Sequence, residues 1–423
     1  MRNSLCLFLA LALSGCTVWP KRWGQQPCCF STKPSVKKQT IAWHLVDVTV
    51  FWPVTQSLNP FQIGRWILRR PVHALNLKDG QVFDSAFFTN QDPASLSSEQ
   101  MRWGPTQLGD SAQGPFLITR MKREGKTSGF FVTDAAGKRY LFKLDPIDAP
   151  ELLSGAEVVT SKLLHALGYR VPSYEIVILE PKDLKVSAES VQRDNYGRAH
   201  PVTLEDVTRQ IRPRLRQGRL RVVASRIVDG QILGPARFKD FRNCAEMRAL
   251  KVAYAWLNNI DAKDHNTLLV WDGKQTLGYL IDFGTSLGAD AGRAGLKHPC
   301  AGSTYIVDPV VGVFEMLTLG MFPSGCEAHP QSLGPSLGIL SPEVDPDRWK
   351  PYAPNVAFQA MTREDALWMT RRLGHLSKAQ IEAVVSAAQY IRTEDATLLV
   401  EVIEARRASI LKHYGSGRDD GVL

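Results

Sequence analysis

The stretch NNIDAKDHNTLLVW, residues 258–271, joins a dense cluster of polar side chains to an apolar strand candidate. A second apolar run, TLGYLIDF, follows the turn DGK and ends just beyond Asp282. Two apolar runs around a short turn of this composition predict a β-hairpin. Because a hairpin returns to the place where it started, it would bring Asp282 next to Asp261 and Asn266. A carboxylate at the end of an apolar strand is costly unless something pairs with it, so these residues are the first candidates for a functional site.

The segments on either side of the hairpin differ in character. Upstream, a helix is predicted from about Phe238, because four apolar residues fall on one helical stripe. These are Met247, Leu250, Tyr254 and Leu257. Downstream, residues 288–340 are rich in Gly and Pro and show little periodicity, which predicts a long loop or short helices only.

The last 60 residues predict three helices, each with a capping sequence at its start. They begin at Thr362, Ser377 and Thr393, and the first and third end at Gly374 and Gly415. The second half of the chain is therefore expected to be rich in helices, with one embedded hairpin.

The first half predicts strands. From about Gly114, the runs GPFLITRMK, FFVT and KRYLFKLD are separated by short turns and predict a three-stranded antiparallel meander. A helix follows, with Ser154 and Glu157 at capping-box spacing and Gly168 at its end. Residues 171–179 predict a further strand.

An Arg-rich segment then alternates Arg212, Arg214 and Arg216. In a hairpin these side chains would line one face. Such a face is interpreted as a solvated edge that discourages strand pairing, with a groove for an acidic substrate as the alternative.

The polar cluster and the strand after it resemble two motifs of protein kinases. D-A-K-D-H-N, residues 261–266, is similar to the D-x-K-x-x-N catalytic loop. LIDFG, residues 280–284, resembles the metal-binding strand, in a form close to that of phosphoinositide kinases. Lys143 and Glu157 occupy the places of the third-strand lysine and of its partner on the next helix. VVASRIVDGQ, residues 222–231, resembles the last small-lobe strand and the hinge.

The resemblance implies an α+β, bilobal protein-kinase-like fold with a strand-rich N-lobe and a helix-rich C-lobe. It also implies ATP or another nucleotide, with Mg²⁺ or Mn²⁺, as cofactors. Asp261 would orient the acceptor hydroxyl, with Lys263 beside it in the catalytic loop, and Asn266 and Asp282 would hold the metal. The acceptor, which could be a protein, a glycan or a lipid head group, is not indicated.

The nucleotide-binding side of the resemblance lies in the first half. Lys143, held by Glu157, would neutralise phosphate oxygens. The phosphate loop would be EGKTSG, residues 124–129, with Gly125 and Gly129.

Three departures point to an atypical branch, as in HipA-type or phosphoinositide-kinase-like proteins. The loop lacks G-x-G-x-x-G, Asn259 and Ile260 stand where kinases have His-Arg, and no Ala-Pro-Glu follows. Two alternatives stay open at these residues. Glu157 also fits the role of a simple helix-capping residue. A different alignment of the catalytic-loop motif would make Asp264, in place of Asp261, the base.

Two other classes of function remain open. One is a kinase-fold lipoprotein that binds a ligand without catalysis. The other is a serine hydrolase, since G-T-S-L-G matches the nucleophile-elbow pattern and would use Ser286 with Asp308 and His329.

The N-terminus indicates the compartment. A positive start and a short apolar run are followed by LSGC, which resembles the lipobox of bacterial lipoproteins and would make Cys16 the acylated, palmitate-bearing N-terminus. Thr17 is not the Asp associated with inner-membrane retention, so the outer membrane of a bacterial envelope is favoured. No stretch is long enough for a transmembrane helix.

The net charge of +9 is uneven, because residues 17–75 hold eight Lys or Arg and one acid, a net +7. Basic residues beside a lipid anchor favour contact with anionic lipid, and no nucleic-acid partner is expected. The expected organisation is a signal peptide (1–15), a basic membrane-proximal linker (16–75), an N-lobe with the nucleotide-binding meander (76–235) and a C-lobe with the catalytic loop (236–423). In an oxidising compartment Cys300 and Cys326 are expected to form a disulfide.

The lipobox resemblance predicts that Cys16→Ala releases the protein from membranes or blocks its processing. Membrane fractionation and mass spectrometry of the mature N-terminus measure this. A mature chain that starts elsewhere, with no acyl mass on Cys16, would contradict it.

Overall fold

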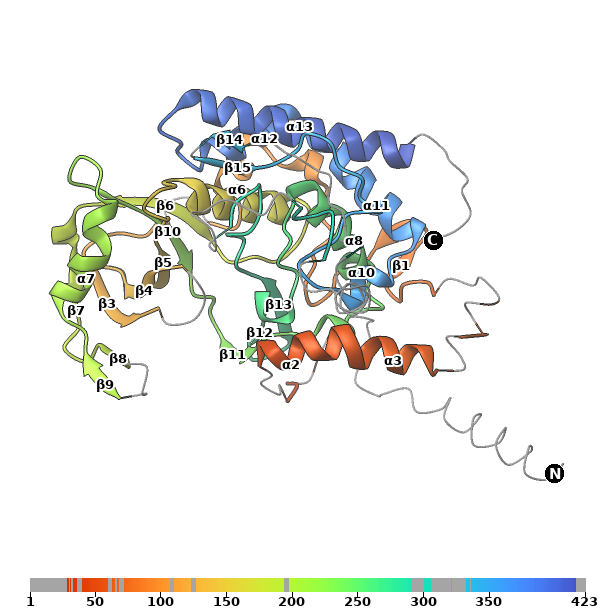
Figure 1. Ribbon diagram of the computed structural model, residues 1–423, viewed down its shortest axis with the longest axis horizontal. Helices are drawn as coiled ribbons and strands as arrows, with labels where there is room; N and C mark the ends of the chain where they lie inside the picture. The colour runs from red at the N-terminus through yellow and green to blue at the C-terminus, as the bar shows by residue number, and fades with distance from the viewer. Residues whose placement is uncertain are drawn as a thin grey trace.

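The structure is a computed structural model. It describes residues 29, 31, 33–35, 40–59, 63–64, 67, 72–106, 110–122, 127–193, 198–290, 300–305, 321, 332–334 and 336–415. Within these residues no helix is both long and apolar enough to cross a membrane. Figure 1 shows a mixed α/β molecule with its largest sheet at one end and most helices at the other.

The largest sheet has six strands in the order β6-β10-β5-β4-β3-β7. All neighbours are antiparallel except β3 and β7. The strands are β3 (Phe116–Met121), β4 (Gly129–Thr133), β5 (Arg139–Lys143), β6 (Tyr174–Leu179), β7 (Leu184–Val186) and β10 (Leu220–Arg226). The predicted meander is thus confirmed as β3-β4-β5, and the predicted strand at 171–179 is confirmed as β6. One face of the sheet packs on α7 (Leu204–Ile211), through apolar side chains such as Phe142 and Val207.

Helix α6 (Leu152–Ala166) packs against β6 and β10 and is buried along almost its whole length. The predicted capping box was wrong. The helix begins after Glu151, which has a left-handed backbone, so Ser154 and Glu157 lie inside it. Ser154 instead donates its N–H and its hydroxyl to the Asp145 carboxylate, at 2.8 and 2.7 Å. Glu157 is therefore free of a capping role.

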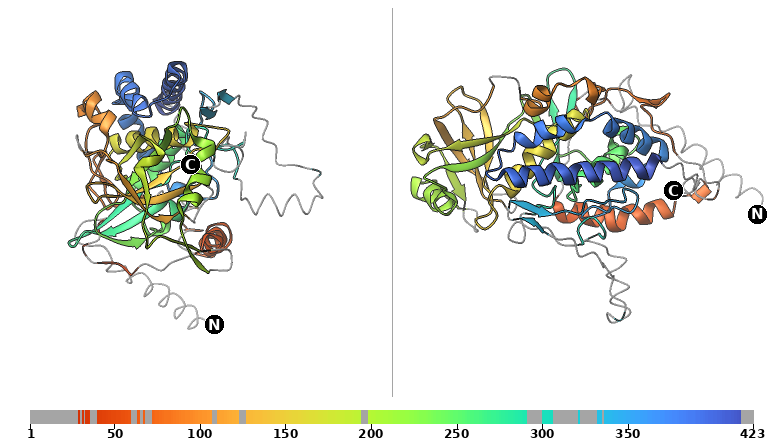
Figure 2. Two further views of the ribbon diagram at one scale, coloured as in Figure 1. Left: turned by 90° about the vertical axis from the view of Figure 1, so that its left-hand side faces the viewer. Right: turned by 90° about the horizontal axis from the view of Figure 1, so that it is seen from above.

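The other half is organised around α8 (Ala245–Leu257), a buried helix that contacts α10 (Val356–Gln359), α11 (Arg363–Gly374) and α13 (Thr393–Gly415). Figure 2 shows α11, α12 and α13 lying over one face of the molecule. The predicted starts of the last helices are confirmed, because Thr362 and Ser377 form capping boxes for α11 and for α12 (Lys378–Ser386).

The predicted hairpin is confirmed as β12 (Thr267–Trp271) and β13 (Thr276–Leu280), to which β11 (Gln231–Gly234) adds a third strand. The shorter elements are β1 (Leu77–Lys78), β2 (Gln81–Val82), α5 (Ser98–Trp103), β8 (Val191–Arg193), β9 (Ala199–Pro201), β14 (Ser332–Gly334) and β15 (Leu337–Ile339), with 3-10 turns at Pro93–Ser95, Pro181–Asp183, Arg212–Arg214, Phe238–Asp240 and Asp264–Asn266. Most of the predicted loop 288–340 lies outside the described residues.

One further expectation differs from the structure, and one segment is more regular than its sequence suggested. The Arg-rich segment is not a hairpin with three arginines on one face, because Arg212–Arg214 form a 3-10 turn at the end of α7. Arg214 turns inward and donates to the Asp145 carbonyl at 2.6 Å. The expected linker contains a helix: α2 (Ile41–Val46), a π turn (Asp47–Phe51) and α3 (Trp52–Ser57) follow one another without a break.

The described cysteines test only part of the predicted disulfide. Cys244 and Cys300 are both disulfide-bonded. Cys326 lies outside the described residues, so the pairing of Cys300 with Cys326 stays a prediction.

Gly155 of α6 gives a test of this packing. A β-carbon at this position would lie 2.2 Å from the Tyr390 hydroxyl, so Gly155→Ala is expected to lower the free energy of unfolding by about 1–3 kcal/mol. Gly374, exposed in α11, is the matched control, because the nearest atom to its added β-carbon is a Leu411 methyl at 3.4 Å. Gly374→Ala should leave stability unchanged or raise it, by up to about 1 kcal/mol. Denaturant titration that finds both variants equal to wild type would contradict the tight contact.

Candidate active site

The site is built around the ammonium group of Lys143. Its Nζ donates to Glu157 Oε1 at 2.5 Å and to Asp282 Oδ1 at 2.8 Å. These three residues come from the end of β5, from the middle of α6 and from the turn after β13. The sheet, the helix and the hairpin therefore meet at one ion triad. The expected pairing of Lys143 with Glu157 is confirmed, and Asp282 joins this pair.

Backbone packing fixes the position of Lys143. It is the last residue of β5, paired with Gly129 on β4 and with Val223 on β10. A β-carbon on Gly129 would lie 2.2 Å from the Phe142 carbonyl oxygen, so only glycine allows β4 to approach β5 this closely. A role for Gly129 in cofactor binding stays a prediction, and Gly125 lies outside the described residues.

Burial and charge oppose one another in the triad. Burial alone would lower the pKa of Lys143, but the Asp282 and Glu157 carboxylates raise it above its usual range, and the lysine stays charged. Burial raises the pKa of Glu157 to about 7, against the opposing effect of Lys143. The charge of Lys143 lowers the pKa of Asp282 to about 2. Asp282 is thus held as an anion, and Glu157 is poised between its two forms.

Asp282 is presented to solvent by an unusual backbone. Its φ is +63°, a left-handed conformation that L-residues rarely adopt and that clusters at functional sites. Its N–H donates to the Tyr174 hydroxyl at 3.3 Å, and the next residue, Phe283, packs edge-on against the Tyr174 ring. The side chain of Asp282 is 52% exposed, against 2% for Glu157. The turn therefore directs a carboxylate out of the apolar strand toward solvent.

The polar loop lies beside this turn. Lys263 Nζ contacts Asp261 Oδ2 at 2.5 Å, and Asn266 Nδ2 donates to the Asp261 carbonyl at 2.8 Å. The Ile281 N–H donates to the Asn266 carbonyl at 3.0 Å, which ties the loop to the residue before Asp282. The charge of Lys263 also contributes to lowering the pKa of Asp282, after that of Lys143.

The loop residue Asp264 has a structural role. Its Oδ1 accepts from the Phe238 N–H at 2.9 Å, and its Oδ2 lies 3.1 Å from His44 Nδ1. Both carboxylate oxygens of this buried residue have partners, which favours a structural role for Asp264 over the role of the base.

The environment of Ser286 does not fit the serine hydrolase hypothesis. Its side chain is fully buried, and its hydroxyl lies 2.6 Å from both the Phe283 carbonyl and the Thr160 hydroxyl. A nucleophile elbow needs an exposed hydroxyl, which Ser286 does not offer. Asp308 and His329 lie outside the described residues.

Two residues near the triad were missed from the sequence. Lys122, just after β3, contributes to lowering the pKa of Glu157 and of Asp282, and its Nζ also donates to the Thr127 carbonyl and hydroxyl at 2.8 and 2.6 Å. Its place beside the Gly-containing turn was the available signal. No sequence signal pointed to Tyr174, because a tyrosine on a strand is usually interpreted as a core residue.

A second group of potential metal ligands lies elsewhere. One ligand atom each from Asp345, Asp347 and His413 lie within 4.8 Å of one another. Asp347 already accepts from Tyr414 at 2.6 Å and pairs with His413 at 2.8 Å. These internal bonds account for the group without a cation.

No family model matches the chain, and no curated protein sequence matches it. Among solved structures it is similar to the proinflammatory kinase CtkA of Helicobacter pylori, at 13% identity over 70% of this chain and 92% of that chain, with a TM-score of 0.36. It is also similar to the Golgi casein kinase with Mn/ADP bound, at 11% identity over 95% of this chain and 96% of that chain, with a TM-score of 0.35. Both TM-scores lie below 0.5, so these likenesses carry no argument about the site.

The raised pKa of Glu157 predicts a pH dependence of stability. With a pKa of about 7 when folded and an ordinary value of 4.5, Glu157 keeps a proton in the folded protein that the unfolded chain releases between these pH values. Its contribution to the free energy of unfolding is therefore lost as the pH rises from about 4.5 to 7. In Glu157→Gln the side chain cannot titrate, so the variant lacks this loss. The free energy of unfolding of Glu157→Gln minus that of wild type should therefore increase from pH 4.5 to pH 7.

Urea titrations at several pH values between 4.5 and 7.5 measure this difference. Glu205→Gln, at a side chain that is 84% exposed, is the control and should follow wild type at every pH. A constant difference between Glu157→Gln and wild type would show that Glu157 does not titrate in this window.

Proposed function

We propose that this chain is an atypical kinase-like phosphotransferase that uses a metal-bound nucleotide. The observation that carries the proposal is the buried Lys143, shared between Glu157 and the half-exposed Asp282. Phosphoryl transfer needs a positioned cation for the phosphates, oxygen ligands for a divalent metal and a carboxylate for the acceptor hydroxyl. The triad and the adjoining loop supply all three kinds of group.

The residues present fit a nucleotide with a divalent cation. Lys263 and Lys122 add to the effect of Lys143 in lowering the pKa of Asp282, and these cations suit the phosphates of a nucleotide. Glu157 keeps one oxygen, Oε2, buried and without a hydrogen-bond partner, which is an expensive arrangement away from a functional site. Carboxylate and amide oxygens are ligands that suit Mg²⁺ and Mn²⁺.

Each residue has a role in this proposal. Asp282 and the Asn266 side-chain oxygen would hold Mg²⁺ or Mn²⁺, since the Asn266 amide nitrogen is already committed to the Asp261 carbonyl. The bound cation would supply charge neutralisation at the phosphates. Lys143, positioned by Glu157, would bind phosphate oxygens of ATP or another nucleotide.

Asp261 would orient the acceptor hydroxyl and accept its proton. Its Oδ2 contacts Lys263, a cation that would also contact the transferred phosphoryl group. The acceptor is a protein, a glycan or a lipid head group. The protein would act as a lipid-anchored component of the bacterial envelope, held through Cys16 and its basic N-terminal segment.

Two substitutions separate binding from transfer. Mn²⁺–ATP at a hundredfold excess over its dissociation constant should raise the free energy of unfolding by about 2.7 kcal/mol. Asp282→Asn should remove most of this gain, because it deletes a ligand charge. Asp261→Asn should keep the gain but slow transfer of labelled γ-phosphate by about 10²–10⁴-fold, because it removes the proton acceptor.

Glu205→Gln, at a side chain on α7 that is 84% exposed, is the control and should match wild type in both assays. Nucleotide stabilisation without transfer in wild type would favour a nucleotide-binding protein without catalysis. Stabilisation that survives in Asp282→Asn would overturn the proposed metal site.

A further inference from the structure

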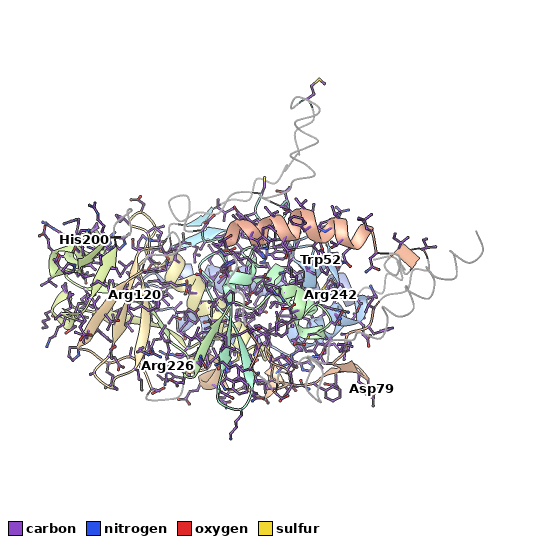
Figure 3. The ribbon with its side chains drawn as sticks, turned by 90° about the horizontal axis from the view of Figure 1, so that it is seen from below. Trp52, Asp79, Arg120, His200, Arg226 and Arg242 are labelled. Atoms are coloured by element: carbon purple, nitrogen blue, oxygen red, sulfur yellow. The ribbon has the colours of Figure 1, made fainter. Side chains whose placement is uncertain are left out.

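The helix formed by residues 41–57 has one side docked on the protein. His44 is buried and pairs with Asp264, and Asp47 pairs with Lys239. Val48 packs with Ala353 and Val356 in a small apolar cluster. Further along, the Arg242 guanidinium lies 4.8 Å from the ring centre of Trp52. These contacts run the length of the helix, and Figure 3 shows Trp52 and Arg242 where it meets the body of the protein.

The opposite side of the helix is apolar and exposed. Residues at spacings of three and four follow one stripe, and their neighbours Ile41 and Phe51 add to it. The members of this apolar face are Ile41, Trp43, Val46, Val50, Phe51, Val54 and Leu58, between 42% and 75% exposed. Figure 1 shows the helix as one rod along the edge of the molecule.

No charged side chain interrupts this face. The ionisable residues of segment 41–57 are His44 and Asp47, and both are engaged on the docked side. A water-facing helix normally carries charged residues on its outer side. Contiguous exposed apolar residues of this kind mark a surface that binds something.

The flanking sequence favours a lipid surface as the partner. Lys37 and Lys38 precede the helix, and Arg65, Arg69 and Arg70 follow it. An apolar helix face with aromatic residues and basic flanks is the pattern of helices that lie in the plane of an anionic bilayer interface. Trp43 and Phe51 pack on each other with ring centres 5.4 Å apart, which places an aromatic pair on the face. A groove-binding protein partner would not account for the basic flanks.

We propose that the apolar face of residues 41–58 lies in the interface of an anionic lipid bilayer. The docked side of the same helix holds Asp264, in the middle of the loop that carries Asp261 and Asn266. A helix fixed in the bilayer plane therefore fixes the orientation of this loop toward the membrane surface. This orientation would decide which acceptors reach Asp261, and that consequence rests on the proposed function. The binding of the helix to lipid does not depend on the proposed function.

Quenching of tryptophan fluorescence by brominated lipid tests the proposal on the full chain, purified in detergent and reconstituted into phosphatidylethanolamine–phosphatidylglycerol vesicles. The fraction of tryptophan emission that brominated lipid quenches is measured for wild type and for Trp43→Phe. The difference between the two fractions reports the contact of Trp43 with lipid. Introducing Val50→Asp into the wild-type background should reduce this difference about threefold or more, because a charge on the apolar face opposes its burial. Replacing phosphatidylglycerol with phosphatidylcholine should also reduce it.

Ile391→Asp is the matched control, because Ile391 is an apolar side chain that is 76% exposed and outside the helix. It should leave the quenching unchanged. Equal melting curves for the two Asp variants confirm that each is folded. The lipid proposal is overturned if Trp43→Phe or Val50→Asp leaves the quenched fraction unaltered. It is also overturned if the chain is a dimer in detergent that Val50→Asp dissociates, since the face would then bind a second copy.

Discussion

The ammonium group of Lys143 is the point on which the site depends. It is buried with a Glu157 side chain that is 2% exposed, and such a charge is tolerated only when it is paired. Removing one partner of a buried ion pair typically costs about 3–5 kcal/mol, because the other charge stays behind uncompensated. The end of β5, the middle of α6 and the turn after β13 are therefore bound to one another electrostatically as well as by packing.

This constraint explains the opposite behaviour of the two carboxylates. Both accept from the same nitrogen, yet Glu157 is enclosed by α6 and the residues around Gly284, whereas Asp282 reaches solvent. Desolvation therefore dominates at Glu157, and the charge of Lys143 dominates at Asp282. Two carboxylates with separated pKa values are a frequent property of catalytic centres. The left-handed backbone at Asp282 belongs to the same arrangement, since it turns this carboxylate out of the strand.

The N-terminal helix extends this connection to the surface. Its His44 occupies the second oxygen of Asp264, so a residue of the polar loop is held from outside by a segment near the N-terminus. The loop is thus supported on one side by the hairpin, through Ile281 and Asn266, and on the other by the helix. A helix that binds lipid and also supports the polar loop would link the position of the protein at the membrane to the access of acceptors to the site. No change of fold is needed for this link.

The sequence alone determined the elements and much of the site. The meander, the hairpin and the starts of α11 and α12 followed from apolar periodicity, turns and capping residues, which are local properties of the chain. The pairing of Lys143 with Glu157 was expected from the resemblance, and the structure adds Asp282 to this pair. The capping box at Ser154 was wrong because Asp145, nine residues earlier in the chain, takes both donors of Ser154.

Only the tertiary structure decided the roles that depend on distant partners. Asp264 and Asp261 have the same side chain three residues apart, and His44, 220 residues from Asp264, makes one of them structural. Ser286 matched a nucleophile pattern, but burial against Thr160 removes it from solvent. The helix at residues 41–57 resembled a linker because its inner side is stabilised by Asp264, Lys239 and Arg242, which no local pattern reveals. Local sequence fixes periodicity and caps, whereas burial, ion pairing and exposure depend on which distant residues the fold brings into contact.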